Sequence, residues 1–301
     1  MRVGLSLMPE EDFRAASQPL FEQGLVDALE WNVDMGWGKP AVPAWARELL
    51  DAYSSDDRLY GHGVEFSLLS AELHPRQVWW LEQLEAERGQ RRYVHLSEHF
   101  GFMTAGDFVR GTPLPHPRSD AAVRLGAERL ARIADIVKAP VGLENLAFAF
   151  GLRDVEEQPG FIDEILAPGG GFLLLDLHNL HCQSINFGLD VEQLLARYPL
   201  ARVRELHVAG GSWVRPGADP ERRAFRRDSH DDRLPEDLFP LLRHALDVLP
   251  NVEVVILERT DHSLFGSDEI TQFRDDYLRV RSIVEAANGR GPRGPEGHHD
   301  R

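Results

Sequence analysis

The 301-residue sequence predicts an α/β fold, a (β/α)₈ TIM barrel, and three observations lead to it. Short apolar runs alternate with helical stretches from one end of the chain to the other. Eight of these runs are found, and they are mostly apolar on both faces, as in a parallel sheet that is covered on both sides. Right-handed crossovers join eight such strands most simply as a closed barrel.

The elements follow in order along the chain. The apolar runs predict strands over residues 3–7, 26–32, 58–62, 92–97, 140–144, 172–176, 202–207 and 252–258. Apolar residues three and four positions apart predict helices over 42–54, 76–88, 119–139, 190–199 and 235–250. Ser119 and Asp120 supply a capping signal at the start of the third of these helices.

Two Gly- and Pro-rich stretches interrupt this alternation. Residues 100–117 and 209–233 are predicted as long loops after the fourth and seventh strands, on the face where long loops usually carry function. Residues 1–288 are expected to form one catalytic domain. The tail 289–301 has no apolar residue and is expected to be disordered, so His298 and His299 are not considered as ligands.

Composition limits the classes of partner and compartment. A formal charge of -16, from 33 basic and 49 acidic residues, disfavours nucleic acid and favours a small or peptidic partner. The single cysteine, Cys182, excludes an internal disulfide framework and fits a reducing cytoplasm. We see neither a signal peptide nor an apolar run of the roughly 20 residues that cross a membrane. The expectation is therefore a cytoplasmic protein without a membrane partner.

The predicted strands share one further property, because most of them stop on a side chain that can bind a metal ion. The residues at or just past these ends are His62, Glu98, His99, Glu144, Asp176, His178, His207 and Glu258. In a parallel barrel these ends open on one face, where such barrels place their chemistry. The repetition predicts a metal centre on that face.

Each residue also has a purely structural alternative. His62, between two glycines, could be a hydrogen-bonded core histidine. Neighbours on a strand face opposite sides, so only one of Glu98 and His99 is expected in the site, and we favour His99. His95 is expected to be structural. A buried Glu144 could instead pair with an arginine in the barrel mouth.

The remaining candidates lie in three short segments. Residues 176–181 are the densest, with Asp176, His178, Asn179 and His181, whereas the adjacent Cys182 is left out because free cysteine is usually a small buried residue.

Glu205 and His207 share a strand face, and Asp228 and His230 repeat that spacing, although a solvated run with Asp231 and Asp232 is the alternative. For Glu258, Arg259 is the obvious structural partner. Together the imidazoles and carboxylates exceed what one tetrahedral zinc ion needs, and they suit two or three ions of iron, manganese or zinc.

Seven stretches within residues 61–259 resemble the multinuclear non-haem iron-dependent oxidative enzymes: GHGVEFSL, VHLSEH, GLENLA, LLLDLHNLH, VRELHVAG, DSHD and ILER. The resemblance implies a xylose-isomerase-like barrel that holds two or three iron ions, as Fe²⁺ and Fe³⁺, and uses dioxygen as a cosubstrate. It further implies that the enzyme modifies residues, typically cysteine, of a ribosomally made precursor peptide. A partner protein that recognises the leader of that peptide is also implied.

The resemblance carries a ligand set with it: His62, His99, Glu144, Asp176, Asn179, His181, His207, Asp228, His230 and Glu258. Glu144, Asp176 and His207 would be the catalytic residues, with Asn145 and Glu205 orienting the imidazoles. The stretch with His178 and His181 varies in the family. Gly211 stands where the family commonly has a histidine, so a third metal site or a substrate contact is expected to differ.

Five arginines in the second predicted loop are not explained by the resemblance. Arg215, Arg222, Arg223, Arg226 and Arg227 either meet an acidic peptide or belong to a solvated loop.

Three other functions compete with the oxidase. A divalent-metal sugar isomerase or epimerase would need a lysine or paired glutamates for proton transfer, yet the only lysines, Lys39 and Lys138, lie at no predicted strand end. A metal-dependent endonuclease is disfavoured by the negative charge. A non-catalytic peptide-binding protein with a degenerate metal site is disfavoured by the nearly complete ligand set.

Overall fold

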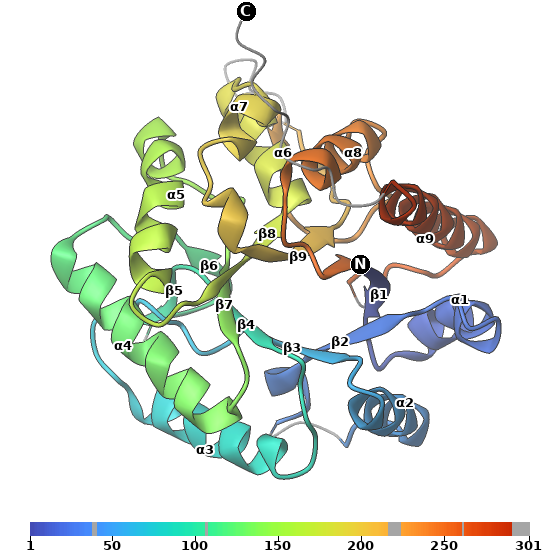
Figure 1. Ribbon diagram of the computed structural model, residues 1–301, viewed down its shortest axis with the longest axis horizontal. Helices are drawn as coiled ribbons and strands as arrows, with labels where there is room; N and C mark the ends of the chain where they lie inside the picture. The colour runs from blue at the N-terminus through green and yellow to red at the C-terminus, as the bar shows by residue number, and fades with distance from the viewer. Residues whose placement is uncertain (38–40, 106–107, 216–223, 261, 291–301) are drawn as a thin grey trace, which may run out of the picture.

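The computed structural model describes residues 1–37, 41–105, 108–215, 224–260 and 262–290. Eight parallel strands form a closed barrel, as the sequence predicts, and helices surround it (Figure 1). The barrel strands are β1 (Arg2–Ser6), β2 (Ala28–Asn32), β3 (Leu59–Gly63), β4 (Leu96–His99), β7 (Val141–Glu144), β8 (Phe172–Asp176), β9 (Val203–Val208) and β12 (Val254–Leu257). The first and last of them pair, Arg2 opposite Val254, and so close the barrel.

The outer layer is formed by α1 (Glu11–Glu22), α2 (Ala44–Ser55), α3 (Pro75–Arg88), α4 (Asp120–Val137), α5 (Leu152–Leu166), α6 (Leu177–Phe187), α7 (Val191–Leu195), α8 (Leu238–Val248) and α9 (Ser267–Asn288), with short 3₁₀ turns at Val33–Gly36 and Leu200–Arg202. The five predicted helices are confirmed as α2, α3, α4, α7 and α8. Ser119 caps α4, its hydroxyl accepting from the Ala122 N–H at 3.1 Å. The helices α1, α5, α6 and α9 lie outside the predicted stretches.

The end of the barrel opposite the site is closed by packing. Ala28, Tyr60, Val254 and Ile256 form a small apolar cluster inside the barrel. Beside it, a Cβ on Gly4 would lie 2.5 Å from the Ala28 carbonyl oxygen, so only glycine fits there. The large core lies between the strands and the helices. The polar strand ends are thus left to the opposite mouth of the barrel.

The two predicted loops are only partly irregular. Residues 100–117 contain a β-hairpin, β5 (Phe102–Ala105) and β6 (Phe108–Leu114), so the prediction of a loop was wrong there. Within 209–233, β10 (Trp213–Val214) pairs with β11 (Phe225–Arg226). Residues 216–223, with Arg222 and Arg223, lie outside the described residues. Both hairpins lie apart from the barrel as separate two-stranded sheets.

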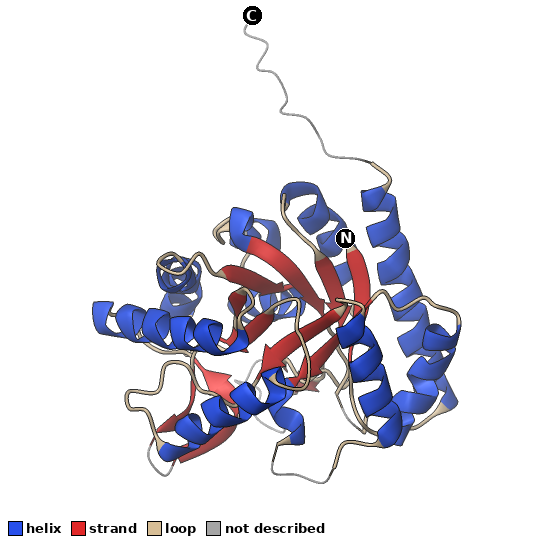
Figure 2. Ribbon diagram, turned by 60° about the horizontal axis from the view of Figure 1, so that its bottom comes forward, coloured by secondary structure: helices blue, strands red, loops and turns tan. Residues whose placement is uncertain are grey.

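The long helix α9 runs beside the barrel and brings the two described ends of the chain together (Figure 2). The Met1 amine donates to the Asn288 side chain at 3.0 Å. The predicted division at residue 288 coincides with the last residue of α9, and it stays a prediction. Of the predicted tail, residues 291–301 lie outside the described residues. Among the described helices, none is long and apolar enough to cross a membrane.

Candidate metal centre

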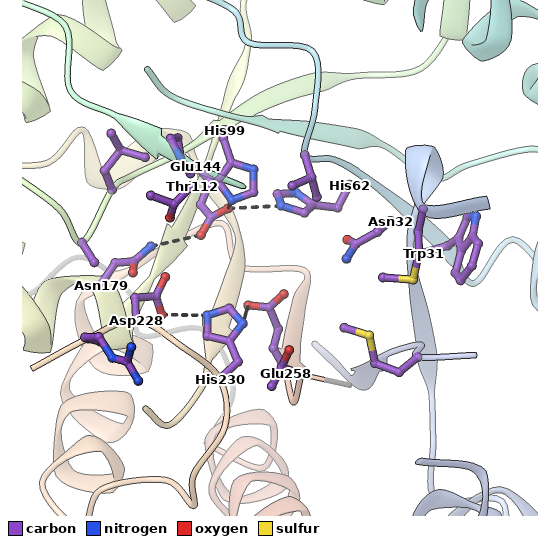
Figure 3. A pocket seen from close by; sticks show the side chains of 18 of the residues that line it. Trp31, Asn32, His62, His99, Thr112, Glu144, Asn179, Asp228, His230 and Glu258 are labelled. Atoms are coloured by element: carbon purple, nitrogen blue, oxygen red, sulfur yellow. Dashed lines mark hydrogen bonds and ion pairs between the residues drawn. The ribbon is translucent and has the colours of Figure 1, made fainter. Parts of the chain in front are cut away.

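A pocket of about 850 Å³ opens at the carboxyl ends of the barrel strands. Figure 3 shows His62, His99, Glu144, Asn179, Asp228, His230 and Glu258 gathered around it. Its lining thus combines side chains from barrel strands with side chains from α6 and the connection after β11. Strand ends that are far apart in the sequence are brought to one place by the closure of the barrel.

The first cluster is His62, His99 and Glu144. Both imidazole Nε2 atoms lie 3.3 Å from the same oxygen, Glu144 Oε2. The Nδ1 atoms are engaged elsewhere, that of His62 with the Ser97 hydroxyl at 2.8 Å and that of His99 with the Gly63 carbonyl at 3.2 Å. A proton on Nδ1 leaves the Nε2 lone pair for a metal ion.

The charges of this cluster are strongly coupled. Burial raises the pKa of Glu144, but the nearby His99 and His62 outweigh burial and lower it overall. Burial alone would lower the pKa of His62. The hydrogen bond to Glu144 and the charge of Glu30 outweigh this effect of burial and raise the pKa to about 9. Burial lowers the pKa of His99. A cation between these groups would replace the proton that His62 otherwise holds.

The second cluster surrounds Glu258, with Asp176, His207 and His230. Glu258 Oε2 lies 3.0 Å from His207 Nδ1 and 3.6 Å from His230 Nδ1. Burial raises the pKa of Glu258, but the two imidazoles outweigh it and hold the pKa well below its usual range. Burial, together with the charges of Asp228 and Glu144, raises the pKa of Asp176 well above its ordinary value. Such crowded, water-excluded carboxylates call for compensating positive charge.

The third cluster is His178, Asp228 and His230. Asp228 Oδ1 lies 3.0 Å from His178 Nδ1 and 2.7 Å from His230 Nε2. His230 adopts a left-handed backbone conformation, with φ of 52°, which is uncommon for a residue other than glycine. A Cβ on Gly211 would overlap the Arg227 carbonyl oxygen and lie 3.0 Å from His178 Cε1. His178 therefore packs directly beside Gly211.

Two buried glutamates, Glu30 and Glu205, contact histidines in the barrel interior. Glu30, on β2, is fully buried and accepts from His207 Nε2 at 2.9 Å, which turns Nδ1 toward Glu258. Sequence reasoning missed Glu30, and the available signal was a lone carboxylate in the otherwise apolar run ALEW. Glu205 lies 2.7 Å from His95 Nε2, and 3.9 Å from His207 Nε2. His95 thus contacts Glu205 in the barrel interior, as a structural role would require.

Several buried atoms at these clusters have no hydrogen-bond partner among the described residues: Glu144 Oε2, Asp176 Oδ2, Asn179 Oδ1, His207 Nδ1 and Glu258 Oε2. Buried polar atoms are nearly always paired in native proteins. Oxygen and imidazole nitrogen atoms of this kind are the ligands that iron, manganese and zinc accept. The residues present therefore fit a centre with more than one metal ion.

Most predicted ligands converge in this arrangement. Eight of them fall within groups of ligand atoms that lie within 4.8 Å of one another: His62, His99, Glu144, Asp176, His207, Asp228, His230 and Glu258. Asn179 donates to Glu144 Oε1 at 3.1 Å. His181 lies in none of these groups among the described residues, and its ring stacks on His178 at 6.2 Å. Burial lowers the pKa of His181 to about 4. The ligand roles themselves stay a prediction.

The contacts of Arg259, Asn145 and Cys182 bear on the structural alternatives to metal binding. The guanidinium of Arg259 donates to Ser263 rather than to Glu258. Asn145 donates to the Asp176 carbonyl at 3.2 Å and accepts from its N–H at 2.7 Å, which fixes the end of β8. Cys182 is buried beside His178, with Sγ 3.7 Å from Nε2, and burial raises the pKa of its thiol.

Solved structures that resemble this chain are TIM-barrel enzymes. An L-ribulose 3-epimerase matches with a TM-score of 0.57 and 13% identity, over 100% of this chain and 99% of that one. Endonuclease IV from Thermus thermophilus matches with a TM-score of 0.56 and 17% identity, over 95% and 100%. At such low identity these likenesses show the fold alone.

Sequence relatives match over most of their length. A UPF0276 protein of Caulobacter vibrioides is 26% identical over 294 residues, 97% of this chain and 95% of its own. A UPF0276 protein of Bordetella pertussis is 31% identical over 264 residues, 86% and 85% respectively. The model of the RiPP precursor modification enzyme MbnB/TglH/ChrH, where RiPP denotes a ribosomally synthesised and post-translationally modified peptide, matches residues 40–282. The chain therefore belongs to the MbnB/TglH/ChrH family.

Proposed function

We propose that this protein is a multinuclear iron, dioxygen-dependent oxidase that modifies cysteine residues of a ribosomally made precursor peptide. The observation that carries the proposal is a set of buried ligand atoms that form no hydrogen bond with a described residue, on Glu144, Asp176, Asn179, His207 and Glu258. One ion would leave part of this set unsatisfied, whereas two or three would engage it. Membership of a family of RiPP precursor modification enzymes supports a peptide as the substrate.

Different residues of the chain would bind the metal ions and orient their ligands. His62, His99 and Glu144 would hold one ion, and Asp176, His230 and Glu258 a second. His207 would lie between them, because its ligand atoms group with Glu144 and Asp176 as well as with Glu258. Glu30 would fix His207 in the tautomer that presents Nδ1. Bound iron would supply Lewis acidity toward a substrate thiolate and electrons for the reduction of dioxygen.

The shape of the pocket supports a peptide rather than a small sugar. The lining combines the ligand residues with apolar side chains, among them Met8, Trp31, Met35 and Val42. A volume of about 850 Å³ accommodates several residues of a chain. Apolar walls suit side chains that flank a reacting cysteine and exclude water from it. A leader-recognising partner protein remains part of the proposal.

The sugar isomerase or epimerase is the competing function, and the shared fold does not separate the two. Lys138 follows the last residue of α4 and is not part of the pocket lining. Lys39 lies outside the described residues. Glu144 and Glu258 both line the pocket, so the described residues do include a pair of glutamates of the kind that the sugar reaction would need. The family match is what favours peptide modification.

The test is metal content and dioxygen sensitivity after anaerobic purification from iron-supplemented cells. We expect two or more iron ions per chain and absorption that changes on exposure to dioxygen. The Glu258→Gln variant should lose part of the iron, whereas the exposed Glu85→Gln variant should keep all of it. One zinc or manganese ion per chain, or an iron-free protein that epimerises a sugar, would overturn the proposal.

A further inference from the structure

One cation that lines the pocket, Arg226, has no side-chain hydrogen bond or ion pair with the described residues, and it lies outside the metal clusters. Arg226, on β11, is 6% exposed, and its Nε is buried with no hydrogen-bond partner among the described residues. It makes no ion pair with any described carboxylate. Burial of this donor is costly, because the Nε–H loses water without gaining an acceptor.

The backbone holds Arg226 firmly in place. Its N–H donates to Asn186 Oδ1 at 2.8 Å, and its carbonyl accepts from Asn186 Nδ2 at 2.9 Å, so α6 and β11 are joined by two hydrogen bonds. The guanidinium lies over the Trp213 ring, 5.5 Å from its centroid. Because the guanidinium stacks on the ring through its face, its in-plane N–H donors stay available for a ligand. Arg226 is thus oriented before any ligand arrives.

The other arginines of this segment differ from it. Arg227 also lines the pocket, but its guanidinium donates to the Ser212 hydroxyl at 2.5 Å and lies 3.9 Å from Asp231. Arg215 is exposed. Asp228, two residues further on, has Oδ1 engaged by His178 and His230. Of the described arginines in this segment, only Arg226 combines burial, a place in the pocket and an unpaired guanidinium.

We propose that Arg226 is a substrate-binding residue that pairs with a carboxylate of the bound peptide, and this rests on the proposed peptide-modifying function. A carboxylate matches the planar fork of arginine and would satisfy the buried Nε. Elsewhere the described pocket lining holds acidic groups, such as Glu144, Asp228 and Glu258. An anionic group of the substrate is therefore directed to the wall that carries Arg226, which sets the orientation of the peptide relative to the metal clusters.

The carboxylate has two possible sources, the C-terminus of the peptide or an acidic side chain beside the reacting residue. Three synthetic probes separate them: N-acetyl-Ala-Cys-Ala as the free acid, the same peptide amidated, and N-acetyl-Ala-Cys-Asp amidated. Dissociation constants are measured by calorimetry without dioxygen, so that no turnover intervenes. We expect one of the two carboxylate probes to bind about tenfold more tightly than the uncharged probe.

The variants assign that preference to one side chain. Arg226→Gln should remove the preference for a carboxylate, Arg226→Lys should keep only part of it, and Arg215→Gln should keep it in full. Equal binding of all three probes, absence of binding, or a preference that survives in Arg226→Gln would overturn the inference. Should Arg226→Gln fail to fold, the wild-type preference and its reduction in Arg226→Lys decide the question.

Iron content and dioxygen uptake of the same preparations keep this test separate from the proposed function. A protein with iron and dioxygen uptake but without carboxylate preference overturns only the role of Arg226. A carboxylate preference in a protein that lacks iron overturns the oxidase and leaves the binding role of Arg226 standing.

Discussion

Glu30 and His207 lie 177 positions apart in sequence, yet their side chains meet at 2.9 Å in the barrel interior. Both are fully buried. Burial raises the pKa of Glu30 despite the opposing influence of His207. The carboxylate determines which ring nitrogen of His207 carries the proton, and therefore which one faces Glu258. Substitution of a residue that orients a metal ligand in this way usually lowers metal affinity or activity substantially.

Glu30→Gln is accordingly expected to weaken metal binding at His207 about 10–100-fold, because the neutral amide supports the orienting proton less strongly. Titration of the metal-free protein with Fe²⁺ against a chelator measures this. Glu85→Gln, exposed on α3, is the matched control and should bind as the wild type does. An unchanged affinity in Glu30→Gln would show that Glu30 has no influence on the centre.

The strand-end candidates could be predicted because a histidine or carboxylate that ends an apolar run stands out in the sequence. Glu30 could not be selected in the same way, since its place opposite His207 exists only once β2 and β9 belong to one closed barrel. The contact between His178 and Asp228 could not be predicted for a related reason. It depends on the connection after β11, whose course the sequence does not indicate.

Among the elements, the hairpin β5–β6 shows how a short segment positions part of the pocket. Ser67 has a left-handed backbone, with φ of 63°, and its hydroxyl accepts from the N–H groups of Met103 and Thr104 at 2.7 and 3.0 Å. These bonds attach β5 to the connection after β3. Thr112 and Pro113, near the end of β6, line the pocket.

Ser67→Ala should therefore detach the hairpin, because two buried N–H groups lose their acceptor at a cost of about 1–3 kcal/mol. We expect faster hydrogen exchange at Met103 and Thr104 and a lower free energy of unfolding. Ser55→Ala, at the exposed end of α2, removes a hydroxyl that bonds only within its own helix and should change neither. Unaltered exchange at both amides would mean that Ser67 does not hold the hairpin.

The elements that could be predicted from the sequence are those whose apolar residues follow a regular spacing within the element itself. Apolar runs that alternate with helical stretches identified the eight barrel strands and five of the helices. The hairpin was missed because its glycines and prolines are typical of a loop, and Gly101 does adopt a positive φ of 108°. The pairing of β5 with β6 depends on contacts that the local sequence does not indicate. The helix α6 was missed because it begins directly after β8, within the segment predicted to bind metal, with Asp176 as its cap.

At the scale of the whole molecule, α9 completes the fold by binding the start of the chain. The Tyr277 hydroxyl donates to the carbonyls of Val3 and Leu25 at 3.2 and 2.9 Å. Arg274 donates to the Ala15 and Ala16 carbonyls, both at 2.8 Å. These bonds join α9 to the first strand and to the helix that follows it. Packing of α9 is therefore expected to limit global stability.

Asp276 on α9 links this packing to pH. Its Oδ2 accepts from the Leu234 N–H at 2.9 Å, and burial outweighs that bond and the nearby arginines, raising its pKa from 3.8 to about 6. Because the folded pKa lies above the unfolded one, the contribution of this group is most favourable below pH of about 4 and is lost as pH rises through 6. Above that range the buried carboxylate is charged and destabilises the fold.

Asp276→Asn should thus stabilise the protein at pH 8 by about 1–2 kcal/mol, a shift of two pKa units discounted for partial solvent exposure. The amide oxygen can still accept from Leu234, so the hydrogen bond is retained. Denaturant unfolding of both proteins from pH 4 to 8 measures the difference, which should vanish at the acid end. The exposed neighbour provides the control, since Asp275→Asn should show no such pH-dependent gain. A gain that is equal at pH 4 and pH 8 would mean that the titration of Asp276 does not couple α9 to the stability of the barrel.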